Sequence, residues 1–247
     1  MVEPSFHDTA AGRRIAYHKT EGKGPGVVFL GGFKSDMEGT KALALEAWAK
    51  QAGRSFLRFD YSGHGQSSGA FTDGCIGEWA EDARSVIEAV TKGPQVLVGS
   101  SMGGWISALL IRELGKKCAG FVGVAAAPDF TEDSMWRDLN EIERAKLKRE
   151  GQIFLPSDYG DPYPITRKLI EDGRRNLVLR EPLQMPFPVR LLQGTADADV
   201  ERQVALNLLD NIRGDDVRLT FVKGADHRFS DEACLALLIQ SVEEVLA

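Results

Sequence analysis

The sequence predicts an α/β fold with a mostly parallel central sheet, helices on both faces and an inserted helical cap. Short β-branched, apolar runs alternate with longer helical patterns along the chain, as in βαβ units. The runs VVFL and VLVG are apolar throughout, as expected for strands covered on both faces. One charged segment interrupts the alternation, which indicates an insertion into the sheet and not another βα unit.

Seven apolar runs are predicted to be strands. They span residues 14–18, 26–30, 55–60, 95–99, 120–125, 189–193 and 217–222. Helices are predicted between them at residues 41–51, 76–89, 102–114, 200–211 and 231–245. Gly53 and Gly115 follow two of these helices and are typical stop signals, since glycine adopts the left-handed conformation without steric cost.

The interrupting segment, residues 129–181, is predicted to be a cap over one end of the sheet. It holds 22 of the chain's 66 charged side chains, whereas residues 1–128 and 182–247 form the body. Within it, Met135, Leu139 and Ile142 recur at helical spacing and predict an amphipathic helix. The apolar face of that helix could line a pocket for an acyl group, but packing the cap onto the body is the default interpretation.

Composition excludes several classes of protein. The 247 residues carry a net charge of −6, whereas binding to nucleic acid requires clustered basic side chains. The longest apolar run, residues 118–127, is about half the length needed to cross a bilayer. The N-terminus does not resemble a secretory signal. Three widely separated cysteines favour reduced thiols and a cytoplasmic location.

The strongest chemical signal is a G-x-S-x-G motif with Ser101 at its centre. A buried strand precedes it and a helical pattern follows, which is the context expected for a nucleophilic serine on a strained turn. Gly99 and Gly103 supply the small residues that such a turn needs. Ser101 is therefore the predicted nucleophile, and a nearby base must accept its proton.

His227 is the predicted base because it follows the last strand and precedes the terminal helix. The remaining histidines fit less well: His7 is in the N-terminal tail, His18 is in an early strand, and His64 is in a glycine-rich loop. Asp197, in the loop after strand 189–193, is the predicted acid. Asp199 is a competitor for that role, and Asp197 could instead be a helix cap.

Two backbone N–H groups are predicted to stabilise an oxyanion. Met102 N–H begins the helix after the nucleophile, and Phe33 N–H follows two glycines after an early strand. The alternative for the Phe33 loop is a simple tight turn. The loop at residues 60–67, DYSGHGQS, lacks phosphate-binding spacing and is interpreted as a structural turn bordering the site.

These segments resemble a known superfamily. GSSMGG, DYSGHGQS, GTADADV and GADHRF are similar to the α/β-hydrolases, and the resemblance covers nearly the whole chain outside the cap. FLGGFKSDMEG, LVGSSMGGW and PVRLLQG resemble the mitochondrial palmitoyl-protein thioesterase family, also known as mycophenolic acid acyl-glucuronide esterases. The resemblance implies a serine hydrolase acting on acyl thioesters and acyl glucuronides, with Ser101, Asp197 and His227 as nucleophile, acid and base.

The chain departs from its relatives at two positions. Gly31 and Gln193 each stand where relatives often have histidine. Neither position belongs to the predicted triad, so both are interpreted as affecting loop packing. The mitochondrial location does not carry over, because the sequence has no recognisable transit peptide.

The sequence thus predicts a serine hydrolase that needs no cofactor and no metal. The expected substrate is a small-molecule ester or acyl thioester, or an S-acylated protein. Two alternatives stay open: another reaction on this scaffold, such as that of a peptidase or a lyase, and a ligand-binding module without turnover.

Overall fold

The central sheet has eight strands in the order β1-β2-β4-β3-β5-β6-β10-β12 in the computed structural model, which describes residues 3–156 and 162–247. The strands are β1 (Ser5–Asp8), β2 (Arg14–Thr20), β3 (Lys23–Leu30), β4 (Arg54–Phe59), β5 (Gln95–Ser100), β6 (Cys118–Val124), β10 (Val189–Gly194) and β12 (Val217–Val222). β2 runs antiparallel to both its neighbours, β1 and β4, and every other neighbouring pair in this sheet is parallel, so the mostly parallel sheet is confirmed.

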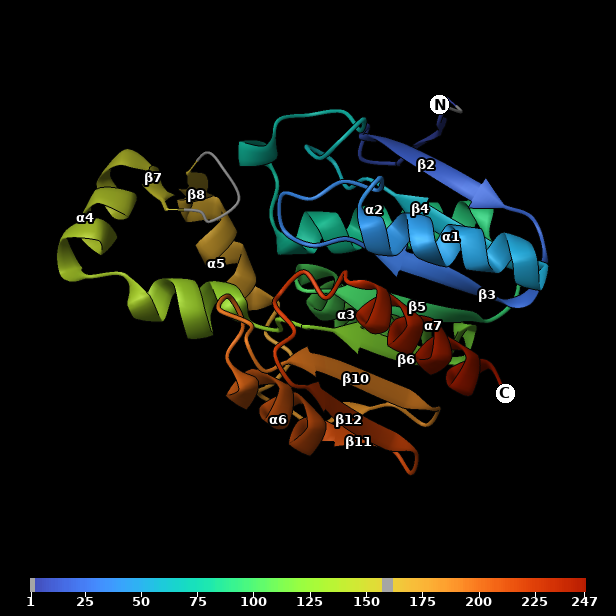
Figure 1. Ribbon diagram of the computed structural model, residues 1–247. Coiled ribbons are helices and arrows are strands. Elements are labelled where there is room, and N and C mark those ends of the chain that lie inside the picture. Colours follow the sequence, from blue (N-terminus) through green and yellow to red (C-terminus); the bar gives the residue numbers. More distant parts are fainter. Residues whose placement is uncertain (1–2, 157–161) are drawn as a thin grey trace.

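Helices cover both faces of the sheet (Figure 1). The α-helices are α1 (Thr40–Ala52), α2 (Ile76–Val90), α3 (Met102–Leu114), α4 (Glu141–Glu150), α5 (Arg167–Arg175), α6 (Arg202–Asn211) and α7 (Glu232–Leu246). Short helical turns are η1 (Phe71–Asp73), η2 (Gly115–Lys117) and η3 (Thr131–Trp136), of which η3 is a π-helix. None of the helices in the described ranges is long and apolar enough to cross a membrane.

The alternation of side chains along each central strand divides the core into two layers. In β3, Val27 and Phe29 join the cluster formed with α1 and α7. Val28 and Leu30 join the cluster formed with α2 and α3 on the other face. Because both faces of these strands are buried, the strands are apolar throughout, as the sequence predicted.

The parallel strands point their carboxyl ends toward one side of the molecule. The elements of residues 129–181 lie beyond this edge (Figure 1). They comprise η3, α4, α5 and a small antiparallel sheet of β7 (Gln152–Leu155) and β8 (Tyr163–Thr166). A second small sheet, β9 (Leu183–Gln184) with β11 (Ile212–Arg213), lies outside this segment.

Asp129 ties the two ends of this segment together. Its fully buried carboxylate accepts hydrogen bonds from Val178 N–H at 2.8 Å and Leu179 N–H at 3.0 Å. Arg180 Nη1 donates to the same carboxylate at 3.3 Å. Burial raises the pKa of Asp129, although these hydrogen bonds act in the opposite direction. The segment therefore begins and ends at a single polar junction.

Two sequence predictions are wrong. Residues 5–8 form strand β1 and not a tail; this strand is mostly exposed at the sheet edge, so it carries no apolar run. The single amphipathic helix across Met135, Leu139 and Ile142 is also absent, because a capping box between Asn140 and Glu143 begins a new helix there. Leu139 is buried, whereas Ile142 is 80% exposed.

Candidate active site

Ser101 occupies a strained turn between β5 and α3. Its backbone has φ 53° and ψ −118°, a conformation that residues with a side chain rarely adopt. A Cβ at Gly103 would collide with the carbonyl of Leu30, and a Cβ at Gly99 would collide with the backbone of Gly103. The turn can therefore form only with very small residues on both sides of Ser101.

His227 and Asp197 lie in line with this serine. His227 Nε2 is 3.1 Å from Ser101 Oγ, and Nδ1 is 3.0 and 3.1 Å from the two carboxylate oxygens of Asp197. Because a carboxylate only accepts hydrogen bonds, Nδ1 carries the proton and Nε2 is free to accept one from the serine. The loops after β5, β10 and β12 bring the three side chains together.

Asp197 is held as a buried anion. Its side chain is 1% exposed. Burial alone would raise the pKa of this carboxyl, but hydrogen bonds from His227, Val200 N–H and Gln193 outweigh it and keep the pKa below its ordinary value. The carboxylate therefore stays ionised at neutral pH, where it can orient the imidazole and stabilise its protonated form.

The competitor Asp199 lies on the same loop, but its residue is exposed. Its N–H donates to Asp197 Oδ1 at 2.9 Å. The Asp197 carboxylate also accepts Val200 N–H at 2.9 Å, just before helix α6, so it caps this turn as well as contacting His227. The two roles weighed for Asp197 from the sequence are thus compatible.

Gln193 is a site residue that the sequence reasoning missed. It is 1% exposed at the end of β10, and its Nε2 donates to Asp197 Oδ2 at 2.9 Å and to the Val200 carbonyl at 3.2 Å. Its Oε1 has no hydrogen-bond partner among the described residues. The interpretation of this position as loop packing is therefore incomplete, since the amide contacts the carboxylate directly. The departure from histidine was the available signal.

The two backbone N–H groups predicted to bind an oxyanion belong to residues near the serine. Met102 N–H begins α3, where no intrahelical acceptor exists. The Phe33 loop lies close to the serine, because a Cβ at Gly32 would be 3.4 Å from Ser101 Cβ. Within the described parts of the chain, neither the Phe33 nor the Met102 N–H has a hydrogen-bond acceptor. Both donors are thus available to a substrate oxygen.

A cavity of about 430 Å³ opens in front of Ser101 and His227. Its apolar lining comes from residues 129–181 and from the rest of the chain, and it includes Phe33, Phe130, Met135, Leu155 and Tyr163. The ring of Phe33 contacts Phe130 and Tyr163 edge to face, with centroids 5.6 and 5.7 Å apart. Residues 129–181 therefore supply much of the apolar wall beside the serine.

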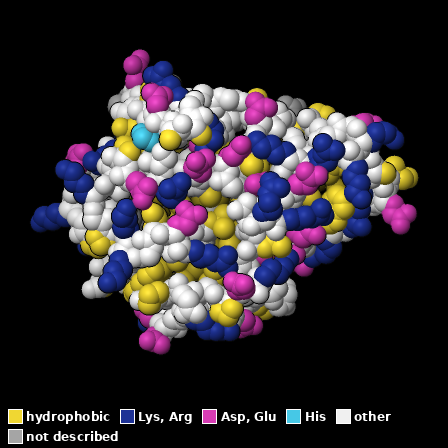
Figure 2. Space-filling view, turned by 180° about the vertical axis from the view of Figure 1, so that it is seen from behind, with side chains coloured by type: hydrophobic (Ala, Val, Ile, Leu, Met, Phe, Trp, Pro, Cys, Tyr) yellow, Lys and Arg dark blue, Asp and Glu magenta, His cyan; other side chains and the backbone are white. Residues whose placement is uncertain are grey.

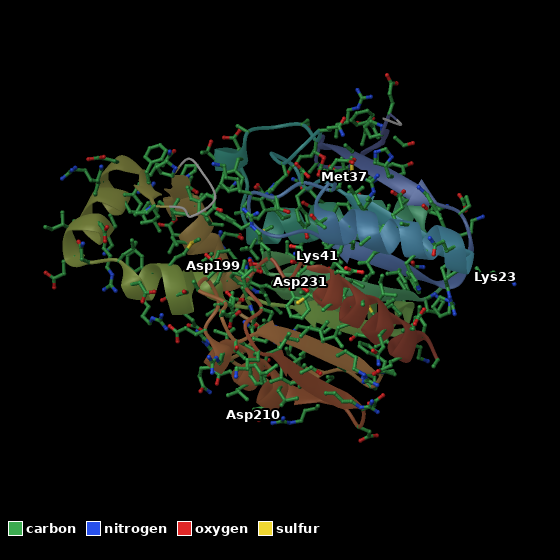
Figure 3. The ribbon with its side chains drawn as sticks, in the orientation of Figure 1. Lys23, Met37, Lys41, Asp199, Asp210 and Asp231 are labelled. Atoms are coloured by element: carbon green, nitrogen blue, oxygen red, sulfur yellow. The ribbon has the colours of Figure 1, made fainter. Side chains whose placement is uncertain are left out.

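Charged residues also line this cavity. They include Lys34, Asp36, Lys41, Asp199 and Arg228. Lys41 and Asp199, labelled in Figure 3, come from the start of α1 and from the loop after β10 and lie at the same end of the sheet. Burial lowers the pKa of Lys41 to about 8, and its Nζ donates to the carbonyl of Arg228, next to His227.

One group among the described residues has the chemistry of a cation site. The ligand atoms of Asp197, Asp199 and His227 lie within 4.8 Å of one another. However, the carboxylate of Asp197 and Nδ1 of His227 are already joined by hydrogen bonds. The grouping is therefore explained without an ion.

The loop after β4 contacts the Phe33 loop through His64. His64 is 4% exposed, its Nδ1 lies 3.1 Å from the carbonyl of Ser62, and its Nε2 accepts Lys34 N–H at 3.2 Å. Burial lowers the pKa of His64 to about 4. The interpretation of this loop as a structural turn bordering the site agrees with these contacts.

Charged side chains of both signs are interspersed over the surface shown in Figure 2. On the part of the chain seen from this side, basic and acidic groups alternate and form no continuous basic stripe.

Comparisons with known proteins agree with this architecture. A family model described as the alpha/beta hydrolase fold matches residues 27–162. The chain is 34% identical to the protein named palmitoyl-protein thioesterase ABHD10, mitochondrial, of Bos taurus, over 94% of this chain and 76% of the relative.

Two solved structures are similar over nearly their whole length. The alpha/beta hydrolase domain-containing protein 10 from mouse has a TM-score of 0.91 and 33% identity, covering 98% of each chain. A putative hydrolase from Agrobacterium vitis S4 has a TM-score of 0.94 and 39% identity, covering 99% of each chain.

The low pKa of His64 predicts a specific pH dependence of stability. Between its unfolded pKa of about 6.5 and its folded pKa of about 4, the unfolded chain binds a proton that the folded chain does not. The free energy of unfolding should therefore fall between pH 7 and pH 4.5, by about 2 to 3 kcal/mol from this residue. Urea unfolding of the natural protein and of His64→Phe at both pH values measures the difference. An equal loss of stability in the two proteins would contradict it.

Proposed function

The chain belongs to the α/β-hydrolase fold family, together with the relatives named palmitoyl-protein thioesterase, and on this premise we propose that it is a serine hydrolase of carboxylic esters and acyl thioesters. The observation that carries the proposal is the chain of hydrogen bonds from Ser101 Oγ through His227 to Asp197. This arrangement is what a serine needs to become a nucleophile.

In the proposed reaction, His227 Nε2 accepts the hydroxyl proton as Ser101 Oγ attacks the substrate carbonyl. Phe33 and Met102 N–H donate to the oxyanion that forms. His227 then gives the proton to the leaving alcohol or thiol as its bond to the acyl carbon breaks. Water repeats the sequence on the acyl-serine and releases the carboxylic acid. Asp197 stays ionised and stabilises the protonated imidazole throughout.

We propose that residues 129–181 act as the cap of this enzyme and that the acyl group lies against the apolar wall. Phe130, Met135 and Tyr163 supply that wall from the cap side of Ser101. Apolar surface recognises an acyl chain by excluding water. The relatives' name specifies a palmitoyl-protein thioesterase, which supports an acyl thioester or an S-acylated protein as the substrate.

The proposal places the enzyme in the cytoplasm. Cys75, Cys118 and Cys234 are buried free thiols, which fits a reducing compartment. The names of the curated relatives place those proteins in mitochondria. Location bears on which acyl donors the enzyme meets and not on the chemistry of the site.

Replacing the proposed nucleophile should abolish turnover without disturbing the fold. Ser101→Ala keeps the Cβ that the strained turn already accommodates, so its stability should match that of the natural protein. Hydrolysis of a short p-nitrophenyl ester should fall by at least about 10⁴-fold, because the remaining groups cannot form an acyl-enzyme. Ser241→Ala, on the distant helix α7, is the matched control and should retain full activity. Retained activity in Ser101→Ala would refute the proposed function, and a fluorophosphonate that leaves Ser101 unlabelled would favour a binding module.

Two further variants separate the candidate acids. Asp197→Asn removes the charge that fixes the imidazole tautomer, so kcat should fall by about 10²- to 10⁴-fold. Asp199→Asn should lower kcat by less than about tenfold, because Asp199 is exposed and because both carboxylate oxygens of Asp197 already contact His227 Nδ1. Steady-state kinetics of both variants on one ester give the comparison. A larger loss in Asp199→Asn would reverse the assignment.

A further inference from the structure

We infer that the loop at residues 60–66, DYSGHGQ, holds the loop at residues 31–37 in its working conformation, with His64 as the positioning residue; the latter loop contains Phe33 and is called the oxyanion loop below. The sequence gives this loop no chemical role, and the proposed mechanism does not use it. The inference rests on the proposed function, because the group that His64 positions is the peptide next to the proposed Phe33 donor.

Three hydrogen bonds connect the two loops on both sides of Phe33. Tyr61 Oη donates to the carbonyl of Gly31 at 3.4 Å, ahead of Phe33. Lys34 N–H donates to His64 Nε2 at 3.2 Å, directly after Phe33. Further along, Met37 N–H donates to Asp60 Oδ1 at 2.7 Å. The side chains of residues 60, 61 and 64 are all buried, so water does not compete for these contacts.

His64 can make its contact only as a neutral ring with one particular tautomer. Its Nδ1 lies 3.1 Å from the Ser62 carbonyl, which can only accept, so Nδ1 carries the proton. Nε2 is then unprotonated and accepts from Lys34 N–H. Tyr61, Phe71 and Trp79 surround the ring, with centroids 5.6, 5.2 and 5.1 Å away.

The buried carboxylates of Asp60 and Asp82, which contact this loop, are already engaged with other groups. Asp60 accepts N–H groups of Met37 and Gln66. Asp82, on α2, accepts from the N–H and Oγ of Ser62 and from Arg13. The ring is therefore held by carbonyl and amide partners and by aromatic packing, and not by an ion pair.

The backbone that His64 holds needs external support. Lys34 has φ 57°, in the left-handed region that residues with a side chain rarely adopt. The peptide between Phe33 and Lys34 thus sits next to a strained residue. Aromatic contacts with Phe71, Phe130 and Tyr163 fix the ring of Phe33. The hydrogen bond to His64 fixes the adjoining amide.

The experiment compares His64→Phe, which keeps an aromatic ring and removes the acceptor, with the natural enzyme. With the Lys34 amide unpaired, kcat per fluorophosphonate-titrated site should fall by about 10- to 100-fold, less than the roughly 10²- to 10³-fold cost of removing an oxyanion donor outright, and KM should change little. Affinity for a boronic acid, which forms a tetrahedral adduct on the serine, should fall by a similar factor. Affinity for the product carboxylate should not change.

Matched variants make the result interpretable. His7→Phe removes another histidine hydrogen bond, the 2.8 Å contact of His7 on edge strand β1 with Ser85 Oγ on α2, and should retain normal kcat. His64→Gln extends an acceptor toward the Nε2 position, whereas His64→Asn is one methylene shorter. Glutamine should therefore restore part of kcat, and asparagine should not. This pair also supplies the test if His64→Phe fails to fold.

A merely structural role would lower the melting temperature while kcat per titrated site and boronic-acid affinity stay unchanged, and that result would overturn the inference. Equal kcat for His64→Gln and His64→Asn would overturn it as well. Turnover in Ser101→Ala would instead refute the proposed function itself, so the two failures are distinguishable.

Discussion

The site depends on one steric constraint, the turn that carries Ser101 from β5 into α3. The residue adopts φ 53° and ψ −118°, and the chain can do so only because Gly99 and Gly103 lie against neighbouring backbone. The turn aims the hydroxyl away from the sheet and leaves Met102 N–H without an intrahelical acceptor. Strain of this kind costs about 1 to 3 kcal/mol and persists only where the surroundings impose it. Buried strands β3 and β6, on either side of β5, provide those surroundings.

The other groups reach the serine because parallel strands end at one edge of the sheet. Loops after β3, β5, β10 and β12 contribute Phe33, Ser101, Asp197 and His227 respectively. The buried carboxylate of Asp197 would be unstable at this edge without partners, and hydrogen bonds from Gln193, Val200 N–H and His227 satisfy its oxygens.

Two further contacts hold the backbone near the site. Lys41 donates to the Arg228 carbonyl and so anchors the loop that carries His227, and His64 anchors the oxyanion loop. The sheet thus sets the approximate positions, and buried polar contacts set the final geometry.

Much of this could be predicted from the sequence, and the limits have physical causes. Apolar and β-branched runs identified seven of the eight strands of the central sheet, and the G-x-S-x-G spacing identified Ser101 because sterics restrict its neighbours. Strand β1 escaped detection because an exposed edge strand needs no apolar run. In residues 129–181, periodicity suggested one helix, but the Asn140 cap overrode it. The contact between His64 and the Lys34 N–H joins residues 30 apart in sequence, and no local pattern encodes it. Gln193 contacts Asp197, only four residues away, but which way its amide points depends on side-chain geometry that the sequence does not state.

The central claim is that catalysis proceeds through an acyl group on Ser101. Rapid acid quenching during turnover of an acyl thioester, followed by peptide mass spectrometry, tests it most directly. The account predicts that the peptide containing Ser101 gains the mass of the acyl group and loses it again as the substrate is exhausted. Acylation of a different residue, or turnover with no acylated peptide under conditions where deacylation limits the rate, would contradict it.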